Sequence, residues 1–211
     1  MSLDAALRSG VAEIGIAMTQ SQHETLISYI ALLHKWNKVY NLTAIREPLE
    51  MISHHILDSL SVLPYLWPKN WLDVGCGAGL PGLVLAVMRP EWQFTLLDSN
   101  SKKTGFVQQA IIELGLKNVS VHCARVEEFM VEERFDGITS RAFTELGDFI
   151  EMTQHLVAEQ GRWAAMKGIA EKELQTVPEG YLVDRVISLH VPKIKAARSL
   201  VVVSRNGAIN P

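Results

Sequence analysis

Cysteine and long hydrophobic runs are scarce in this sequence. Only Cys76 and Cys123 occur among the 211 residues, which is too few for a disulfide framework and indicates reduced thiols in a cytoplasmic protein. The N-terminal segment carries acidic residues and lacks a long apolar stretch, so we expect no signal peptide. No window approaches about 18 uninterrupted apolar residues, and no membrane-spanning helix or membrane partner is expected.

An excess of positive charge is also absent. The net charge at pH 7 is −3, so a protein that coats nucleic acid over its whole surface is excluded, and any contact with phosphate must be local. The seven histidines show no spacing typical of a metal site, so we expect no metal. With 48% hydrophobic and 20% charged residues, the chain is long enough and apolar enough for a substantial core.

The first third of the chain has helical periodicity. Apolar residues recur at helical spacing between residues 26 and 36, and Ser21 with Glu24 matches a capping box just before them. Two prolines then interrupt the pattern. We therefore predict an N-terminal helical extension over residues 1–68 and a second domain over residues 69–211.

From residue 70 onward, strand-like segments alternate with helical ones. The strand-like segments are WLDV (71–74), WQFTLLD (92–98), VSVHC (119–123), FDGITS (135–140) and GRWAAMKG (161–168), and the helical ones cover 81–89, 101–115 and 145–157. This alternation predicts an α/β fold in which a mostly parallel sheet carries helices on both faces. Two last segments, YLVDRVISLH (181–190) and SLVVVSR (199–205), have no helix between them and predict a closing antiparallel hairpin, which makes seven strands in all.

The stretch LDVGCGAGLPG (72–82) places four glycines directly after a strand-like segment. Glycine permits positive φ angles and lets a ligand approach the backbone. Two registers fit: residues 77–82 match G-x-G-x-x-G, the dinucleotide fingerprint, and residues 73–79 match D-x-G-x-G-x-G. In both registers Asp98 ends the next strand-like segment, where its carboxylate can accept both ribose hydroxyls.

Charge favours the second register. A pyrophosphate binds best to backbone N–H groups without a carboxylate nearby, yet Asp73 places one at the strand end and Pro81 removes one N–H group. S-adenosylmethionine has no phosphate, and it carries an ammonium and a sulfonium that a carboxylate attracts. The loop therefore predicts S-adenosylmethionine as the cofactor and Asp73 as one of its binding residues.

Other classes of function stay open on the residues alone. An NAD-dependent oxidoreductase needs a hydride-transfer partner, and the only tyrosine followed four residues later by a lysine is Tyr65, in a proline-rich segment. A binding module without catalysis is a second alternative, against which the complete loop and Asp98 argue. A methyltransferase that acts on another RNA or on a small molecule is a third.

Several motifs, taken in order, resemble the class I S-adenosylmethionine-dependent methyltransferases and, more closely, the bacterial glucose-inhibited division B family of ribosomal RNA small subunit methyltransferases G. The motifs are WNKVYNLTAIRE (36–47), HHILDSL (54–60), WLDVGCGAGLPGLVLA (71–86), LLDSNSKKTGF (96–106), ARVEEF (124–129), TSRAF (139–143) and MKG (166–168). The resemblance covers nearly the whole chain. It implies a Rossmann-like fold, S-adenosylmethionine as cofactor, and methylation of N7 of one guanine in 16S rRNA, within the 30S subunit or a precursor.

The resemblance also implies which residues bind the cofactor. The matching positions are Gly75, Gly77, Gly79 and Leu80 in the loop, Asp98 for the ribose, Val126 and Glu127 for the adenine, and Arg141 on the cofactor side. On the pattern alone, Glu127 fits a solvated helix face equally well, and Arg141 fits a structural ion pair.

The implied chemistry requires little from the protein. Guanine N7 has a lone pair and no proton to lose, so no general base is needed, and catalysis depends on positioning and on excluding water. As catalytic residues we expect Arg141 or Lys167, which could hold the guanine through donors to O6.

RNA binding requires a local positive surface, which three segments could supply. They are residues 190–205, with His190, Lys193, Lys195, Arg198, Arg205 and no acid; Lys35, Lys38 and Arg46; and Lys102 with Lys103. Any one of these lysines fits a solvated rim equally well. As a group near the glycine loop, they favour contact with phosphate.

Overall fold

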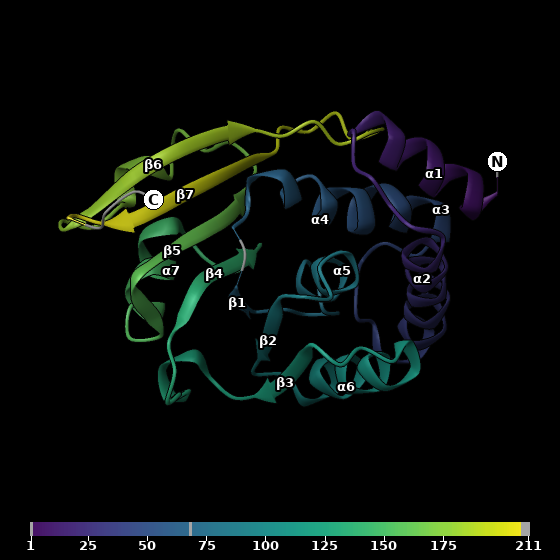
Figure 1. Cartoon of the computed structure of the whole chain (residues 1–211), viewed down its shortest axis with the longest axis horizontal. Coiled ribbons are helices and arrows are strands. Elements are labelled where there is room, and N and C mark those ends of the chain that lie inside the picture. The colour runs from purple at the N-terminus through teal and green to yellow at the C-terminus, as the bar shows by residue number, and fades with distance from the viewer. Residues whose placement is uncertain (1, 68, 208–211) are drawn as a thin grey trace.

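The computed structural model describes residues 2–67 and 69–207, so the predicted division at residue 68 falls outside the described residues. Within them the strands form one seven-stranded sheet of order β3-β2-β1-β4-β5-β7-β6 (Figure 1). The strands are β1 (Asn70–Val74), β2 (Gln93–Asp98), β3 (Val119–Cys123), β4 (Phe135–Arg141), β5 (Val157–Lys167), β6 (Tyr181–Ser188) and β7 (Ser199–Arg205). Strands β1 to β5 pair in parallel, and β7 pairs antiparallel with β5 and β6. The predicted mostly parallel sheet and its closing hairpin are confirmed.

The helices fall close to the predicted segments, except that the helix in the predicted segment 145–157 ends at Thr153 and β5 already begins at Val157, inside that segment. They are α1 (Leu3–Glu13), α2 (Gln20–Tyr40), α3 (Pro48–Met51), the π-helical turn η1 (Ile52–Leu57), α4 (Asp58–Leu60), α5 (Gly82–Met88), α6 (Ser101–Leu114) and α7 (Leu146–Thr153), with short 3₁₀ turns at Leu63–Tyr65 (η2), Val126–Glu128 (η3) and Leu174–Thr176 (η4). Across the described residues, no helix combines the length and apolar character needed to cross a membrane.

The capping box of α2 lies two residues earlier than predicted. Thr19 is the N-cap: its side chain accepts from the Gln22 N–H group, and the Gln22 side chain accepts from the Thr19 N–H group in return. The prediction of Ser21 with Glu24 was therefore wrong. Gln22 also donates to the carbonyl groups of Val87 and Met88 at the end of α5, and this tertiary contact favours the earlier start.

The sheet separates two apolar clusters, because neighbouring residues of each strand point to opposite faces. Trp71 and Phe94 pack with α5, α6 and the N-terminal helices, whereas Leu72 and Trp163 pack with α7. Both faces are therefore covered by helices, as predicted, and this explains why central strands such as β1, β4 and β7 are buried along most of their length.

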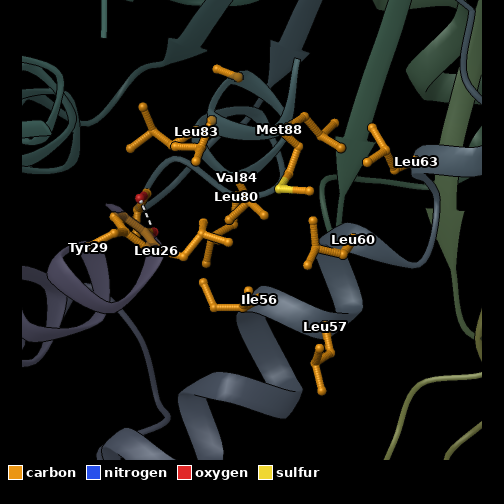
Figure 2. Packing of buried hydrophobic residues seen from close by; sticks show 14 of the residues in the cluster. Leu26, Tyr29, Ile56, Leu57, Leu60, Leu63, Leu80, Leu83, Val84 and Met88 are labelled. Atoms are coloured by element: carbon orange, nitrogen blue, oxygen red, sulfur yellow. Dashed lines mark hydrogen bonds between the residues drawn. The ribbon is translucent and has the colours of Figure 1, made fainter. Parts of the chain in front are cut away.

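The N-terminal extension and α5 share one core (Figure 2). Leu26 from α2 and Ile56 and Leu60 from the α3–α4 segment lie against Val84 and Met88 of α5, and all five side chains are fully or almost fully buried. The extension is consequently fixed against the sheet, with the ends of its helices close to the carboxyl edge of the strands.

Substitutions at two glycines test the packing of the structure, because they should change the free energy of unfolding in opposite directions. A Cβ atom at Gly137 in β4 would lie 2.6 Å from the buried ring of Trp71, whereas one at Gly105, in the exposed interior of α6, meets no atom within 4 Å. We expect Gly137→Ala to lower the free energy of unfolding by about 1–3 kcal/mol through overpacking. Gly105→Ala should raise it by about 0.5–1 kcal/mol, since alanine loses less backbone entropy in a helix. Urea unfolding measures both, and equal effects of the two substitutions would contradict the packing.

Candidate functional site

Two adjoining cavities open at the carboxyl ends of the parallel strands. Their volumes are about 280 Å³ and about 660 Å³, and Gly75, Lys103, Ala142 and Phe143 line both of them. They lie where β1 separates β2 from β4, the point at which the strand order reverses. Open α/β sheets bind their ligands at this point, so the two cavities together form the candidate site.

The glycine loop between β1 and α5 forms the shared wall. Gly75, Gly77 and Gly79 have φ angles of 69°, 56° and 87°, a region that other residues rarely adopt. A Cβ atom at Gly75 would lie 2.6 Å from the Phe143 ring, whereas the nearest atom to one at Gly77 is 3.9 Å away. Gly77 therefore exposes its backbone to the larger cavity, which it lines, as the close approach of a ligand requires.

Asp98 both supports the loop and faces the smaller cavity. Its Oδ2 atom accepts from the Gly77 N–H group at 2.9 Å, and its Oδ1 atom accepts from the Asn100 N–H group at 2.9 Å. Lys103 Nζ lies 3.9 Å from Oδ2. Each carboxylate oxygen can accept more than one hydrogen bond, so Asp98 keeps acceptor capacity for the hydroxyl groups of a ligand.

Asp73 lies behind the loop. It is completely buried and lines neither cavity, and its Oδ2 atom accepts from the Gly82 N–H group at the start of α5 at 2.8 Å. Burial raises the pKa of this carboxyl from 3.8 to about 7. The sequence predicted a direct attraction between Asp73 and a cationic cofactor, but a buried carboxyl that lines neither cavity does not support direct contact. The side chain shapes the loop and occupies the helix end instead.

The smaller cavity contains the residues that were predicted to border adenine. Val126 and Glu127 in η3 line it, together with Asp98, and Met152 of α7 contributes to the wall. Val126 is buried, and the Glu127 side chain is exposed. The cavity therefore combines an apolar surface with carboxylates at its edge, an arrangement that suits a nucleoside.

The larger cavity is lined by charged side chains from distant parts of the chain. Arg141, at the end of β4, donates from Nη1 to the His54 carbonyl oxygen at 2.8 Å and to Asp58 Oδ2 at 3.0 Å. Lys167, at the end of β5, forms an ion pair with Glu173 at 2.5 Å and also donates to the Thr144 carbonyl oxygen. Arg141 is thus part of an ion pair, the alternative that the pattern allowed, and it also lines the cavity.

The predicted RNA-binding residues fall into two groups: some line the larger cavity and the others lie outside it. Arg198 and Lys103 line the larger cavity. The following side chains are exposed outside it: Lys35, Lys38, Arg46, Lys102, Lys193 and Lys195.

Residues 190–205 do not form one positive patch. Arg205 lies at the opposite end of β7 from Arg198 and donates to the Gln154 carbonyl oxygen. His190 Nε2 lies 3.0 Å from a Glu13 carboxylate oxygen. The segment contains no acid in sequence, but acids from the N-terminal extension approach it in space.

Several residues of the site carried no recognisable signal in the sequence. Asp58 and His54 were part of a quoted motif, but no role could be assigned to them, because the π-helical turn η1 and the start of α4 decide which side chains face the cavity. Ala142 has a φ angle of 53° although it is not glycine, and it lies between the two cavities. Such strained residues concentrate at functional sites, but a sequence gives no sign of them.

The burial of Asp73 predicts a pH dependence of stability. Between pH 3.8 and about 7 the folded protein keeps the proton that the unfolded chain releases, so this residue's contribution to the free energy of unfolding falls as pH rises. Asp73→Asn keeps an acceptor for the Gly82 N–H group and cannot ionise. We expect the stability of this variant relative to the unmodified protein to increase from about pH 4 to about pH 7 in urea unfolding series. Stability curves that run parallel across this range would argue against it.

Solved structures with a similar fold are methyltransferases. TrmN from Thermus thermophilus superimposes with a TM-score of 0.60 at 16% identity, over 80% of this chain and 53% of that chain. The N-methyltransferase NodS from Bradyrhizobium japonicum, solved in complex with S-adenosyl-L-homocysteine, gives 0.59 at 13% identity over 83% of this chain and 98% of that chain. The predicted Rossmann-like class I methyltransferase fold is confirmed.

Comparison with known sequences identifies the family more closely than the fold does. A family model described as rRNA small subunit methyltransferase G matches residues 22–202. The Ribosomal RNA small subunit methyltransferase G of Laribacter hongkongensis is 50% identical over 202 residues, which are 95% of this chain and 98% of that protein. The protein of the same name from Pseudomonas aeruginosa is 49% identical over 201 residues, 94% of each chain. The chain belongs to the rRNA small subunit methyltransferase G family.

Proposed function

We propose that this protein transfers a methyl group from S-adenosylmethionine to N7 of a guanine in 16S rRNA, either within the 30S subunit or in a precursor. Membership of the family supports an rRNA substrate. The observation that carries the proposal is the pair of cavities joined at the glycine loop, one suited to a nucleoside and one lined by basic residues. Their volumes are those of ordinary small-molecule sites.

The chain's own residues fit the cofactor. Asp98 has acceptor capacity for the ribose hydroxyls, Val126 and Glu127 border the space for adenine, and Gly77 leaves room beside its backbone for the rest of the molecule. When bound, S-adenosylmethionine supplies an electrophilic methyl group. Of the other predicted loop residues, Gly75 and Leu80 line the larger cavity, whereas Gly79 lines neither cavity and lies close to the Leu83 side chain.

The N-terminus of α5 argues against a dinucleotide. Dinucleotide-binding proteins place a pyrophosphate at the equivalent helix N-terminus, where free N–H groups and the helix dipole favour an anion. Here the Gly82 N–H group is already bonded to the Asp73 carboxylate, and Pro81 has no N–H group to offer. Asp73 therefore favours S-adenosylmethionine by excluding phosphate rather than by attracting the sulfonium.

Arg141 and Lys167 are the residues that we assign to the guanine. The hydrogen bonds found for Arg141 use Nη1, and a guanidinium has further N–H groups on Nε and Nη2. The Lys167 ammonium group has three protons, and its two contacts, with the Thr144 carbonyl oxygen and with Glu173, use two of them. Both side chains can therefore still donate to O6 of the guanine. Guanine N7 has no proton to lose, so it can attack the methyl group without a general base.

The surface around the larger cavity suits single-stranded RNA. Leu42 and Thr43 line the cavity directly after the end of α2, where Tyr40 is 44% exposed and its ring lies 5.2 Å from that of Trp36. Lys35, Lys38 and Arg46 are exposed on the same segment. Aromatic faces with basic neighbours stack unpaired bases and neutralise phosphates, as the binding of an extruded nucleotide requires.

Ligand binding tests the cofactor assignment. We expect S-adenosylhomocysteine to raise the unfolding temperature and NAD to leave it unchanged, because only a ligand that binds the folded state stabilises it. Asp98→Ala should weaken S-adenosylhomocysteine binding by about 10- to 100-fold through lost charge-assisted hydrogen bonds. Glu128→Ala, which removes an exposed acid that lines neither cavity, is the matched control. Stabilisation by NAD alone would refute the assignment.

Mapping of 7-methylguanosine tests the reaction. The protein with S-adenosylmethionine should produce this nucleoside at one position of 16S rRNA, and parallel reactions with naked RNA and with 30S particles identify the substrate form. Arg141→Ala and Lys167→Ala should each lower kcat/KM by at least about tenfold, because each removes a donor from the larger cavity. Unchanged methylation by both variants at limiting RNA would exclude these roles.

A further inference from the structure

One buried carboxylate joins the helical extension to two arginines of the sheet domain. Asp58, the first residue of α4, is 3% exposed. Its Oδ2 atom accepts from Arg141 Nη1 at 3.0 Å, and its Oδ1 atom accepts from Arg198 Nε at 3.0 Å. All three residues line the larger cavity, so this arrangement belongs to the wall of the site and not to the core.

The carboxylate fixes both guanidinium groups while leaving donors for a ligand. The hydrogen bonds found for Arg198 use Nε and Nη1, the latter to the Ala197 carbonyl oxygen, and those found for Arg141 use Nη1. Each guanidinium has five N–H groups, and the two side chains are 28% and 22% exposed. Donors therefore remain on two guanidinium groups that share one carboxylate, an arrangement that a single nucleotide can contact.

We propose that Asp58 is a positioning residue for the RNA substrate, which holds Arg141 towards the guanine base and Arg198 towards a phosphate of the same nucleotide. The inference rests on the function proposed above and deepens it. Arginine suits both tasks because its planar fork matches a base edge and a phosphate. Without a fixed partner, each long side chain would have to lose its rotamer freedom when the RNA binds.

Only a carboxylate can hold both arginines. Asp58 uses one oxygen for each, whereas asparagine has one acceptor oxygen and an NH₂ group that would face a guanidinium donor. Asp58→Asn therefore keeps the shape of the side chain but releases one of the two arginines.

For Asp58→Asn, a positioning role and a purely electrostatic role predict opposite changes in RNA affinity. Removing a negative charge from the edge of an RNA site should tighten binding if only the net charge matters. If Asp58 acts by holding Arg141 and Arg198, the same removal should weaken binding and slow the reaction. The sign of the change in RNA affinity therefore decides between the two accounts.

The experiment compares Asp58→Asn with the unmodified protein on 16S rRNA or 30S particles. We expect KM for RNA to rise and kcat to fall, with kcat/KM lower by at least about tenfold. The slope of log affinity against log salt should become shallower by about 0.7, the value for one lost phosphate contact to a single strand. S-adenosylhomocysteine binding, measured by calorimetry, should stay within about twofold, because Asp98 and η3 are untouched.

Two further variants keep the test decisive if Asp58→Asn folds poorly. Arg198→Lys retains the positive charge but lacks the Nε atom that binds Asp58, so it should show the same loss of kcat/KM. Glu50→Gln removes an exposed acid from α3 of the same extension and should not weaken RNA binding. Tighter RNA binding by Asp58→Asn with unchanged kcat, or full activity of Arg198→Lys, would overturn the inference. Absence of methylation by the unmodified protein would instead overturn the proposed function.

Discussion

The glycine loop between β1 and α5 is held in its open shape by three side chains that bind its backbone, in addition to its backbone hydrogen bonds to Leu97 and Cys76. Asp98 accepts from Gly77, Asp73 accepts from Gly82, and the buried Tyr29 hydroxyl donates to the Ala78 carbonyl oxygen at 2.7 Å. Burial raises the pKa of the Tyr29 phenol, so it stays a hydrogen-bond donor. A glycine-rich backbone has few intrinsic conformational restraints. The three contacts, which come from β1, β2 and α2, restrain it.

The contact from Tyr29 explains why the N-terminal helical extension forms part of the site. The apolar core shared by α2, the α3–α4 segment and α5 brings Tyr29 to the loop, and it also brings Thr43, His54 and Asp58 to the wall of the larger cavity. His55 lies on the same turn, with its Nε2 atom 2.9 Å from Thr43 Oγ1, and burial lowers the pKa of its imidazole to about 4. His55 does not line the cavity, and as a neutral histidine it adds no charge repulsion to the nearby Arg141.

The sequence was sufficient for the order of elements and for the loop, because these depend on local periodicity and on glycine positions. It placed Arg141 and Lys167 at strand ends, which parallel strands bring to one edge. It did not reveal the burial of Asp73 outside both cavities, since a motif gives the residue type at a strand end but not the side of the loop to which the carboxylate points. It did not reveal the partners of Arg198 and His190, because acids distant in sequence become neighbours only through the shared core.

The hydrogen bond between Asp58 and Arg198 spans 140 positions of the chain. During synthesis the helical extension emerges first, and its carboxylate can bind Arg141 once β4 has left the exit tunnel, but it meets Arg198 only after β6 has followed. This wall of the larger cavity is thus completed late, although its acidic member is made early. A polypeptide that ends before Arg198 contains every residue that lines the smaller cavity, but it lacks the second arginine of the larger one.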